Sequence, residues 1–310
     1  MSEGSQVDER LKMPECMSLL TPEVMAVMKR LEWLARRRMQ GTLSGRHTSP
    51  DKGVSVEFAE HREYTPGDDT KNLDWRVMAK SDRNVVKQFI QETNLRATIV
   101  LDVSGSMSFK GEHSDKSKFE YGSELAAALA YLFVKQGDAA GLVTFDHEIR
   151  HLMRAESRPS QVRRICEILY QSEPGEETGV GEVLHEVAER IPTRGLVILI
   201  SDLFDEPQKI VESLHHFNFR QHDLVVFHLL AEEELSFPFQ KFQRFKDLEG
   251  VEEMLRIDPQ AVRAAYLDKL REFIASIEAV CGNIRADYVP VTTKVALPET
   301  LTRYLGSRKL

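Results

Sequence analysis

Residues 95–107 read LRATIVLDVSGSM, and this stretch decides both the fold class and the place of the candidate site. Its first part is a continuous apolar run, which is typical of a strand buried on both faces of a parallel sheet. Polar side chains begin at Asp102, where the run stops. Similar apolar runs recur as AAGLVTFD at 139–146, GLVILISD at 195–202 and DLVVFHLL at 223–230. The sequence therefore predicts a sheet of several buried strands.

Helical patterns lie between these apolar runs. In residues 118–134, for example, Leu125, Leu129 and Leu132 recur on one helical face. Apolar strands that alternate with amphipathic helices indicate an α/β fold, in which helices cover both faces of a mostly parallel sheet. The other expected elements are helices at 161–170, 181–190, 207–217, 259–280 and from about 298, and a short strand at 286–291.

The first 94 residues lack this alternation of apolar strands and helices. Residues 1–20 are polar, and we expect them to be disordered. Thr21 and Pro22 mark a helix start, because threonine caps helices and proline suits the first helical position. The apolar stripe of this helix consists of Val24, Val27, Met28, Leu31 and Leu34. Turn-forming residues dominate 41–80, and 83–92 reads as a strand. We therefore divide the chain into a disordered start (1–20), a helix with an extension (21–94) and a main domain (95–310).

Composition excludes several classes of protein. The chain has 310 residues, of which 42% are hydrophobic, so it can bury a large core without a disulfide or a structural metal. No apolar run approaches the roughly 20 residues of a membrane helix, and the polar start does not resemble a signal peptide. The three cysteines, Cys16, Cys166 and Cys281, are far apart in the sequence, as in reduced proteins. We expect a soluble, cytoplasmic protein with no membrane span.

Nucleic-acid binding is disfavoured by the overall charge. A set of basic residues could form a local patch near the N-terminus: Lys29, Arg30, Arg36, Arg37, Arg38 and Arg46. However, affinity for a phosphate backbone rests on lysine and arginine, and the formal net charge of the chain is −8. We therefore expect no nucleic-acid partner.

Oxygen donors gather where the expected strands end. Asp102, Ser104 and Ser106 follow one apolar strand, Asp202 follows another, and Thr178 lies in a glycine-rich loop before a helix. Ligands bind beyond the carboxyl ends of the strands in an open parallel sheet, so these loops should meet on one rim. Mg²⁺ takes oxygen ligands, typically one or two carboxylates together with waters. The sequence therefore predicts a Mg²⁺ or Mn²⁺ site formed by these five side chains.

Two other interpretations of the same residues stay open. Asp102 could cap a helix while the serines occupy turns. Alternatively, Asp102 could be the nucleophile of a Mg²⁺-dependent phosphatase-like hydrolase. Such an enzyme needs a general acid two residues further on, and Ser104 cannot protonate a leaving group at neutral pH. The sequence contains neither a G-x-x-x-x-G-K-[ST] phosphate loop nor a Cys/His cluster with zinc spacing. We expect a binding module rather than an enzyme.

The segments IVLDVSGSM, GLVTFD, EETGVGEVL and VILISDLFD together resemble a von Willebrand factor A-type domain with a metal-ion-dependent adhesion site. The resemblance covers about residues 95–230, and it implies that Asp102, Ser104, Ser106, Thr178 and Asp202 hold the metal. It also implies that an acidic side chain of a partner completes the metal's coordination. Many such domains have glycine after the last aspartate, where this chain has Leu203. We expect a less flexible loop there.

The segment VEFAEHREYTPGDDTKNLDWRVMAK, residues 56–80, resembles the signature of the domain-of-unknown-function-58 family. That family joins this segment to an A-type domain and is associated with MoxR-type AAA+ ATPases. The resemblance therefore implies an adaptor or co-chaperone-like protein that works with such an ATPase or its client. Asp68, Asp69 and Asp74 could make a second cation site, although aspartates in such segments more often cap turns.

Overall fold

The computed structural model describes residues 18–29, 56–64, 74–81, 84–91, 95–112, 114–175, 179–191, 194–238, 243–245, 255–257 and 259–307. The chain divides into two compact units. Unit 1 consists of residues 1–41 and 95–310, and unit 2 consists of residues 42–94. Each unit is described by itself.

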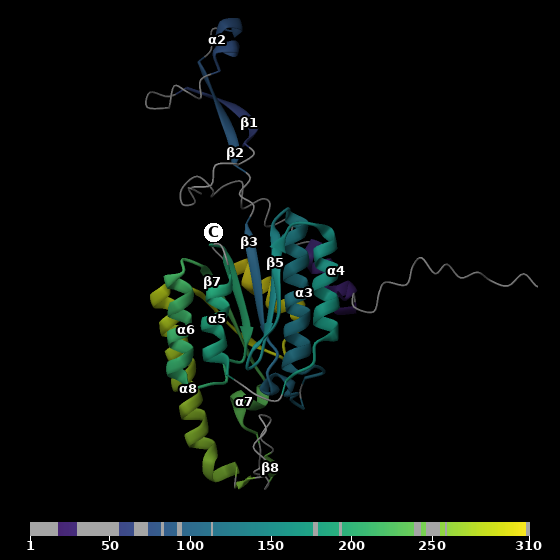
Figure 1. Ribbon diagram of the computed structural model, residues 1–310, viewed down its shortest axis with the longest axis vertical. Coiled ribbons are helices and arrows are strands. Elements are labelled where there is room, and N and C mark those ends of the chain that lie inside the picture. The colour runs from purple at the N-terminus through teal and green to yellow at the C-terminus, as the bar shows by residue number, and fades with distance from the viewer. Residues whose placement is uncertain are drawn as a thin grey trace, which may run out of the picture. The chain divides into compact units, whose positions relative to one another are not determined.

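A six-stranded sheet forms the centre of unit 1 (Figure 1). Its strands in chain order are β3 (Arg96–Asp102), β4 (Ala139–Phe145), β5 (Ile149–Glu156), β6 (Leu196–Ser201), β7 (Asp223–Leu230) and β10 (Asp287–Thr292). Their order across the sheet is β10-β7-β6-β3-β4-β5, and every neighbouring pair is parallel except β4 with β5. The predicted α/β fold with a mostly parallel sheet is confirmed.

The antiparallel strand β5 was not anticipated by the sequence patterns. It lies at the edge of the sheet, and its burial alternates between half-buried and exposed positions. A strand of this kind lacks the continuous apolar run that marks the buried strands, because one of its sides has no neighbour. Its arginines and histidine protect the open edge, since charged side chains discourage pairing with another chain.

Helices cover both faces of the sheet, as the alternating pattern predicts. Figure 1 shows α3 (Lys118–Gln136) and α4 (Pro159–Gln171) on one side, and α5 (Val180–Arg190), α6 (Pro207–Phe219) and α8 (Pro259–Ile284) on the other. The remaining helix, α9 (Leu297–Ser307), packs with α3. The apolar side chains form two separate clusters, one on each face of the sheet. The smaller elements of unit 1 are η4 (Gly105–Ser108), α7 (Glu232–Ser236), β8 (Gln243–Phe245) and β9 (Leu255–Ile257).

The N-terminal helix belongs to unit 1. It covers residues 22–29, and the Thr21 hydroxyl accepts the Val24 N–H at 3.3 Å, as expected of a cap. Leu20, Val24 and Met28 are buried in the cluster that also contains α3. The apolar stripe of this helix is buried against the core of the main sheet domain. The boundary between the two units therefore follows the helix, at residue 41, and does not precede it. Residues 1–17, together with Leu31 and Leu34, lie outside the described residues.

Unit 2 contains an antiparallel pair of strands, β1 (Val56–Glu63) and β2 (Val85–Gln91), with α2 (Trp75–Ser81) between them in the chain. The strand expected at 83–92 is therefore present. Asp74 acts as a helix cap, because its Oδ1 accepts the Val77 N–H at 3.3 Å. Its own N–H donates to the Val85 carbonyl at 2.9 Å. Asp68 and Asp69 lie outside the described residues, so the cation site considered there stays a prediction.

In the described part of the chain, no helix is long and apolar enough to cross a bilayer. Cys166 and Cys281 are buried, whereas Cys16 lies outside the described range. Of the basic residues considered for nucleic-acid binding, Lys29 is exposed, and those from Arg30 to Arg46 are not described.

Asp138 provides a testable electrostatic contribution to the fold. It follows the left-handed Gly137 that ends α3, and its Oδ1 accepts the Leu95 N–H at 3.0 Å, just before β3. Burial raises the pKa of Asp138 to about 6, against the opposing effect of this hydrogen bond. The folded state therefore binds the proton more tightly than the unfolded state, and stability falls as the pH rises from about 4 to about 6.

We predict that Asp138→Asn removes this part of the pH dependence. The amide oxygen can still accept the Leu95 N–H, but it carries no buried charge at neutral pH. Urea denaturation should show the variant gaining about 1 kcal/mol relative to the parent between pH 4.5 and pH 7, after discounting for solvent screening. A stability difference that is the same at both pH values would contradict this interpretation.

Candidate metal centre

The candidate site lies where the chain order across the sheet reverses. From β3 the chain adds β4 on one side and later β6 on the other, so the carboxyl ends of β3 and β6 form the topological switch point, where ligands bind in open α/β sheets. Asp102 is the last residue of β3, and Ser201 is the last residue of β6. The two strands are in parallel register, with Leu101 opposite Ile200. Their terminal polar residues are therefore brought side by side by the sheet itself.

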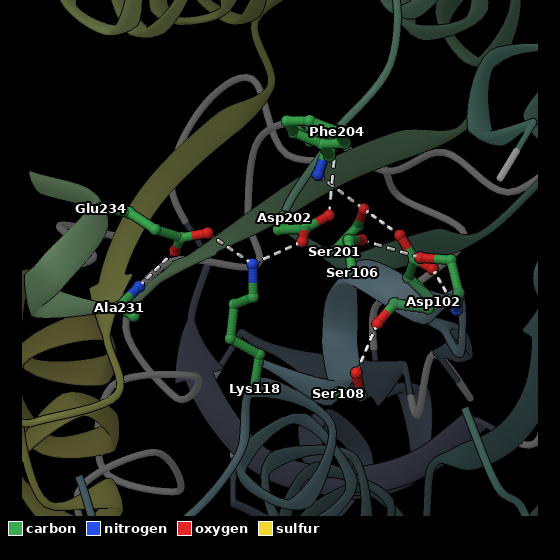
Figure 2. A network of polar contacts seen from close by, with 12 residues as sticks. Asp102, Ser106, Ser108, Lys118, Ser201, Asp202, Phe204, Ala231 and Glu234 are labelled. Carbon is green, nitrogen blue, oxygen red and sulfur yellow. Dashed lines mark hydrogen bonds and ion pairs between the residues drawn. The ribbon is translucent and has the colours of Figure 1, made fainter. Parts of the chain in front are cut away.

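Asp102 is fully buried and accepts hydrogen bonds on both carboxylate oxygens. The Ser104 N–H donates to Oδ1 at 2.9 Å, and the Ser201 hydroxyl donates to Oδ2 at 2.5 Å. Ser104 directly precedes η4, and its hydroxyl lies 3.1 Å from that of Ser106. The Ser106 hydroxyl also contributes to lowering the pKa of Asp202. The structure thus brings together four of the five predicted ligands, namely Asp102, Ser104, Ser106 and Asp202. Figure 2 labels Asp102, Ser106 and Asp202.

The fifth predicted ligand, Thr178, lies outside the described residues, which stop at Gly175 and resume at Gly179. The Gly175 N–H donates to the Val103 carbonyl at 2.7 Å. The loop that carries Thr178 therefore starts beside the loop that carries Ser104 and Ser106. On the other side, α5 begins at Val180. The assignment of Thr178 stays a prediction.

A buried lysine, Lys118, completes the polar network. Its Nζ lies 2.6 Å from Asp202 Oδ2 and 2.7 Å from Glu234 Oε1, and its side chain is 2% exposed (Figure 2). Lys118 is the first residue of α3 and lies inside the capping box formed by Ser117 and Glu120. A cation is unfavourable at a helix N-terminus. The contacts with two carboxylates outweigh this effect, because a buried ammonium requires a negative partner.

The two buried aspartates have opposite pKa shifts. Burial, and then the charge of Asp202, raise the pKa of Asp102 to about 7. Burial also acts to raise the pKa of Asp202, but the Lys118 ammonium outweighs it and holds this pKa below its usual value. Lys118 itself has a raised pKa, because Asp202 and Glu234 overcome the effect of burial. Without a metal, Lys118 therefore supplies the positive charge of the site.

His228 contacts the backbone of Asp202. Burial lowers the pKa of this histidine to about 4, so its ring is neutral. Its Nε2 lies 3.0 Å from the Asp202 carbonyl and must donate to it, which leaves Nδ1 to accept from the Tyr288 hydroxyl at 2.7 Å. A neutral histidine on β7 and a tyrosine on β10 thus hold the backbone of a predicted ligand in place.

The loop after β6 is rigid and strained. The buried Leu203 has a φ of 54°, in the left-handed region that costs a residue with a side chain about 1–2 kcal/mol. Its N–H donates to the Ser201 hydroxyl at 2.8 Å, and the Phe204 N–H donates to Asp202 Oδ1 at 3.2 Å. Asp205 Oδ2 accepts the Gly181 N–H at 2.9 Å, near the start of α5. The reduced flexibility expected from leucine at this position stays a prediction.

The residues present fit a hard divalent cation. Two carboxylates and two hydroxyls converge, and a positive charge already lies against one of the carboxylates. All the donors are oxygens, which suits Mg²⁺ or Mn²⁺. In the described part of the chain, no three His, Cys, Asp or Glu side chains are grouped so that they could hold a metal, which is unlike a zinc site. The hydroxyls are therefore essential to the donor set.

Sequence reasoning predicted the metal ligands but missed the buried lysine beside them. Lys118 is separated from Asp202 by 84 residues and from Glu234 by 116, so no local pattern connects them. One signal was available, because a lysine at the first helical position, inside the S-x-x-E capping box, conflicts with the helix dipole. Such a conflict indicates a specific partner.

The fold and the site define an α/β domain with a mostly parallel sheet and with oxygen donors at its topological switch point. The chain belongs to the family described as "Protein of unknown function DUF58", whose profile matches residues 60–274. Uncharacterized proteins of Mycobacterium tuberculosis and Mycobacterium bovis are each 24% identical to it over 294 residues, covering 93% of this chain and 90% of the relative.

Two solved structures are also similar. BatB from Bacteroides thetaiotaomicron is matched with a TM-score of 0.44 and 18% identity, over 68% of this chain and 98% of BatB. The VWA domain of SpRpn10 is matched with a TM-score of 0.41 and 11% identity, over 67% of this chain and 95% of that domain. The function of the chain has to be argued from its own site.

We predict that Lys118→Met destabilises the metal-free protein by about 3 kcal/mol or more, because it leaves Asp202 buried without a counter-charge. Urea denaturation in chelator measures the loss. The matched control is Lys116→Met, since Lys116 pairs with Glu124 at 2.6 Å but is 40% exposed. That change should cost less than about 1 kcal/mol. Equal losses in the two variants would show that Lys118 does not provide the essential positive charge.

Proposed function

We propose that the chain is a metal-dependent protein-binding module. Asp102, Ser104, Ser106, Thr178 and Asp202 hold one Mg²⁺ or Mn²⁺ at the rim of the sheet, and a carboxylate of a partner protein completes its coordination. The observation that carries the proposal is the convergence of four of these side chains at the ends of β3 and β6, with the Lys118 ammonium already bound to Asp202. The metal supplies positive charge that an acidic partner can reach.

Metal binding requires Asp202 to exchange partners. One of its oxygens contacts Lys118 and the other accepts the Phe204 N–H. A divalent cation carries more charge than the ammonium, and it attracts Asp102 and Asp202 together. Lys118 keeps Glu234 as its partner when Asp202 turns to the metal. The exchange therefore leaves no buried charge without a counter-ion, which makes the metal-bound state electrostatically feasible.

The resemblance to the MoxR-associated family suggests the kind of partner. We propose that the module works with a MoxR-type AAA+ ATPase or with a client that this ATPase remodels, as an adaptor without an energy source of its own. In support of this, the sequence contains no phosphate-binding loop. A binding role also fits the geometry of Asp102, since both of its oxygens are engaged and Ser104 stands where a phosphatase-like hydrolase would need an acid.

We predict that Mg²⁺ stabilises the parent protein and that Asp102→Asn abolishes the effect. Binding at a concentration one hundred times the dissociation constant adds about 2.7 kcal/mol. Calorimetry should show a Mg²⁺ heat for the parent and none for the variant, and chelation should lower the melting temperature only modestly, because the core does not depend on the metal. The control is Asp223→Asn, at the opposite end of β7, which should bind Mg²⁺ like the parent. Unchanged Mg²⁺ binding in Asp102→Asn would contradict the site.

We also predict that Thr178→Ala weakens capture of a purified MoxR-type ATPase without changing the net charge. Capture should fall with this variant and with chelator, and added Mg²⁺ should restore it only in the parent. Thr302→Ala is the matched control, because Thr302 is an exposed threonine on α9. Circular dichroism must show that every variant is folded. Undiminished capture by both Thr178→Ala and the chelated parent would place the interface elsewhere.

A further inference from the structure

An exposed aromatic side chain stands next to the candidate metal centre. Phe204 is 62% exposed, and Figure 2 shows it beside Asp202. It lies two residues after Asp202, so the two Cα atoms are at most about 7.6 Å apart. Any partner that places a carboxylate on the metal therefore also comes within reach of the Phe204 ring.

The backbone of Phe204 is fixed. The φ of Leu203 is 54°, and the Phe204 N–H is hydrogen bonded to Asp202. Leu203 is fully buried in the core cluster that packs against α5 and α6, and the Asp205 N–H donates to its carbonyl at 2.9 Å. With Leu203 held in the core, the next side chain is presented to solvent. The aromatic ring is thus carried on a preorganised support, unlike a side chain on a loose loop.

A single exposed aromatic residue is ordinary by itself. Phe219 illustrates this, since it is 82% exposed at the end of α6. Phe204 differs because the residue before it adopts a left-handed conformation that glycine would adopt without strain. Strain of this kind persists where the surrounding structure enforces it, and it gathers at functional sites. Strain, exposure and contact with a predicted ligand therefore coincide at one loop.

We propose that Phe204 is the apolar half of a two-part docking site whose other half is the metal. The inference rests on the proposed metal-dependent function and names the partner's chemistry: a segment of a partner protein with an aspartate or glutamate and, within two residues of it, a large apolar side chain. The carboxylate binds the cation and the apolar side chain covers the Phe204 ring. An aromatic anchor that excludes water strengthens the neighbouring charged contact, as in the centre of many interfaces.

The requirement for an acidic residue follows from the charges at the rim. Asp102 and Asp202 are buried there, and Glu234 lies beyond Lys118. Without a divalent cation, the only positive charge that the described residues show at this rim is that of Lys118, which is already paired with Asp202 and Glu234. With the cation bound, a carboxylate is the natural additional ligand, since it brings charge that neutral oxygens do not. The apolar contact with Phe204 then discriminates among the many acidic segments of other proteins.

The test is a selection of displayed, randomised seven-residue peptides on the full chain, in Mg²⁺ and in chelator. We expect the Mg²⁺ selection alone to enrich peptides in which Asp or Glu lies within two positions of Leu, Ile, Met, Phe or Trp. A synthetic peptide of the enriched sequence is then titrated by fluorescence anisotropy. Phe204→Ala should weaken its binding about tenfold or more, Phe204→Leu should weaken it less, and Phe219→Ala should leave it unchanged.

Calorimetry with Mg²⁺ alone separates this proposal from the metal site. All three variants should bind Mg²⁺ like the parent, and circular dichroism should show them folded. Enrichment of acidic peptides without an apolar neighbour, or equal peptide affinity for Phe204→Ala and the parent, would overturn the role of Phe204. Mg²⁺ binding with no peptide enriched would overturn the docking site but keep the metal centre. The absence of a Mg²⁺ heat in the parent would overturn both proposals.

Discussion

Two buried carboxylates at the ends of neighbouring strands impose the main constraint on this structure. Asp102 and Asp202 are almost inaccessible to solvent, and like charges so close together cannot both be stable without compensation. The rim is organised around this requirement. Ser201 and Ser104 supply hydrogen bonds to Asp102, and Lys118 reaches from the start of α3 to Asp202. The loops after β3 and β6 and the first turn of α3 therefore have their positions set by charge compensation.

The same constraint connects the site to more distant segments. Lys118 also binds Glu234 on α7. Phe237 directly follows α7, and its ring centroid lies 4.9 Å from that of Tyr266 on α8. Arg263 of α8 donates to the Phe237 carbonyl at 3.1 Å. A continuous chain of contacts therefore joins Lys118 to α8. This continuity gives the rim a physical connection to the far part of unit 1.

The loop after β6 shows how local strain and site geometry depend on each other. Leucine at position 203 gains burial in the core and accepts an unfavourable φ in return. The Ser201 hydroxyl contributes to both features, because it donates to Asp102 and accepts from the Leu203 N–H. One side chain thus fixes a predicted metal ligand and the loop that presents Phe204.

The sequence by itself determined the fold class and most of the predicted ligands. Continuous apolar runs and helical periodicity are local signals, and Asp102 and Asp202 follow such runs directly. The sequence did not predict the edge strand β5, because the burial pattern of this strand is mixed. Only the tertiary structure decided that Lys118 lies beside Asp202 and that the N-terminal helix packs in the main core. These contacts join residues far apart in the sequence, and they depend on how the sheet is ordered and covered, which no local periodicity encodes.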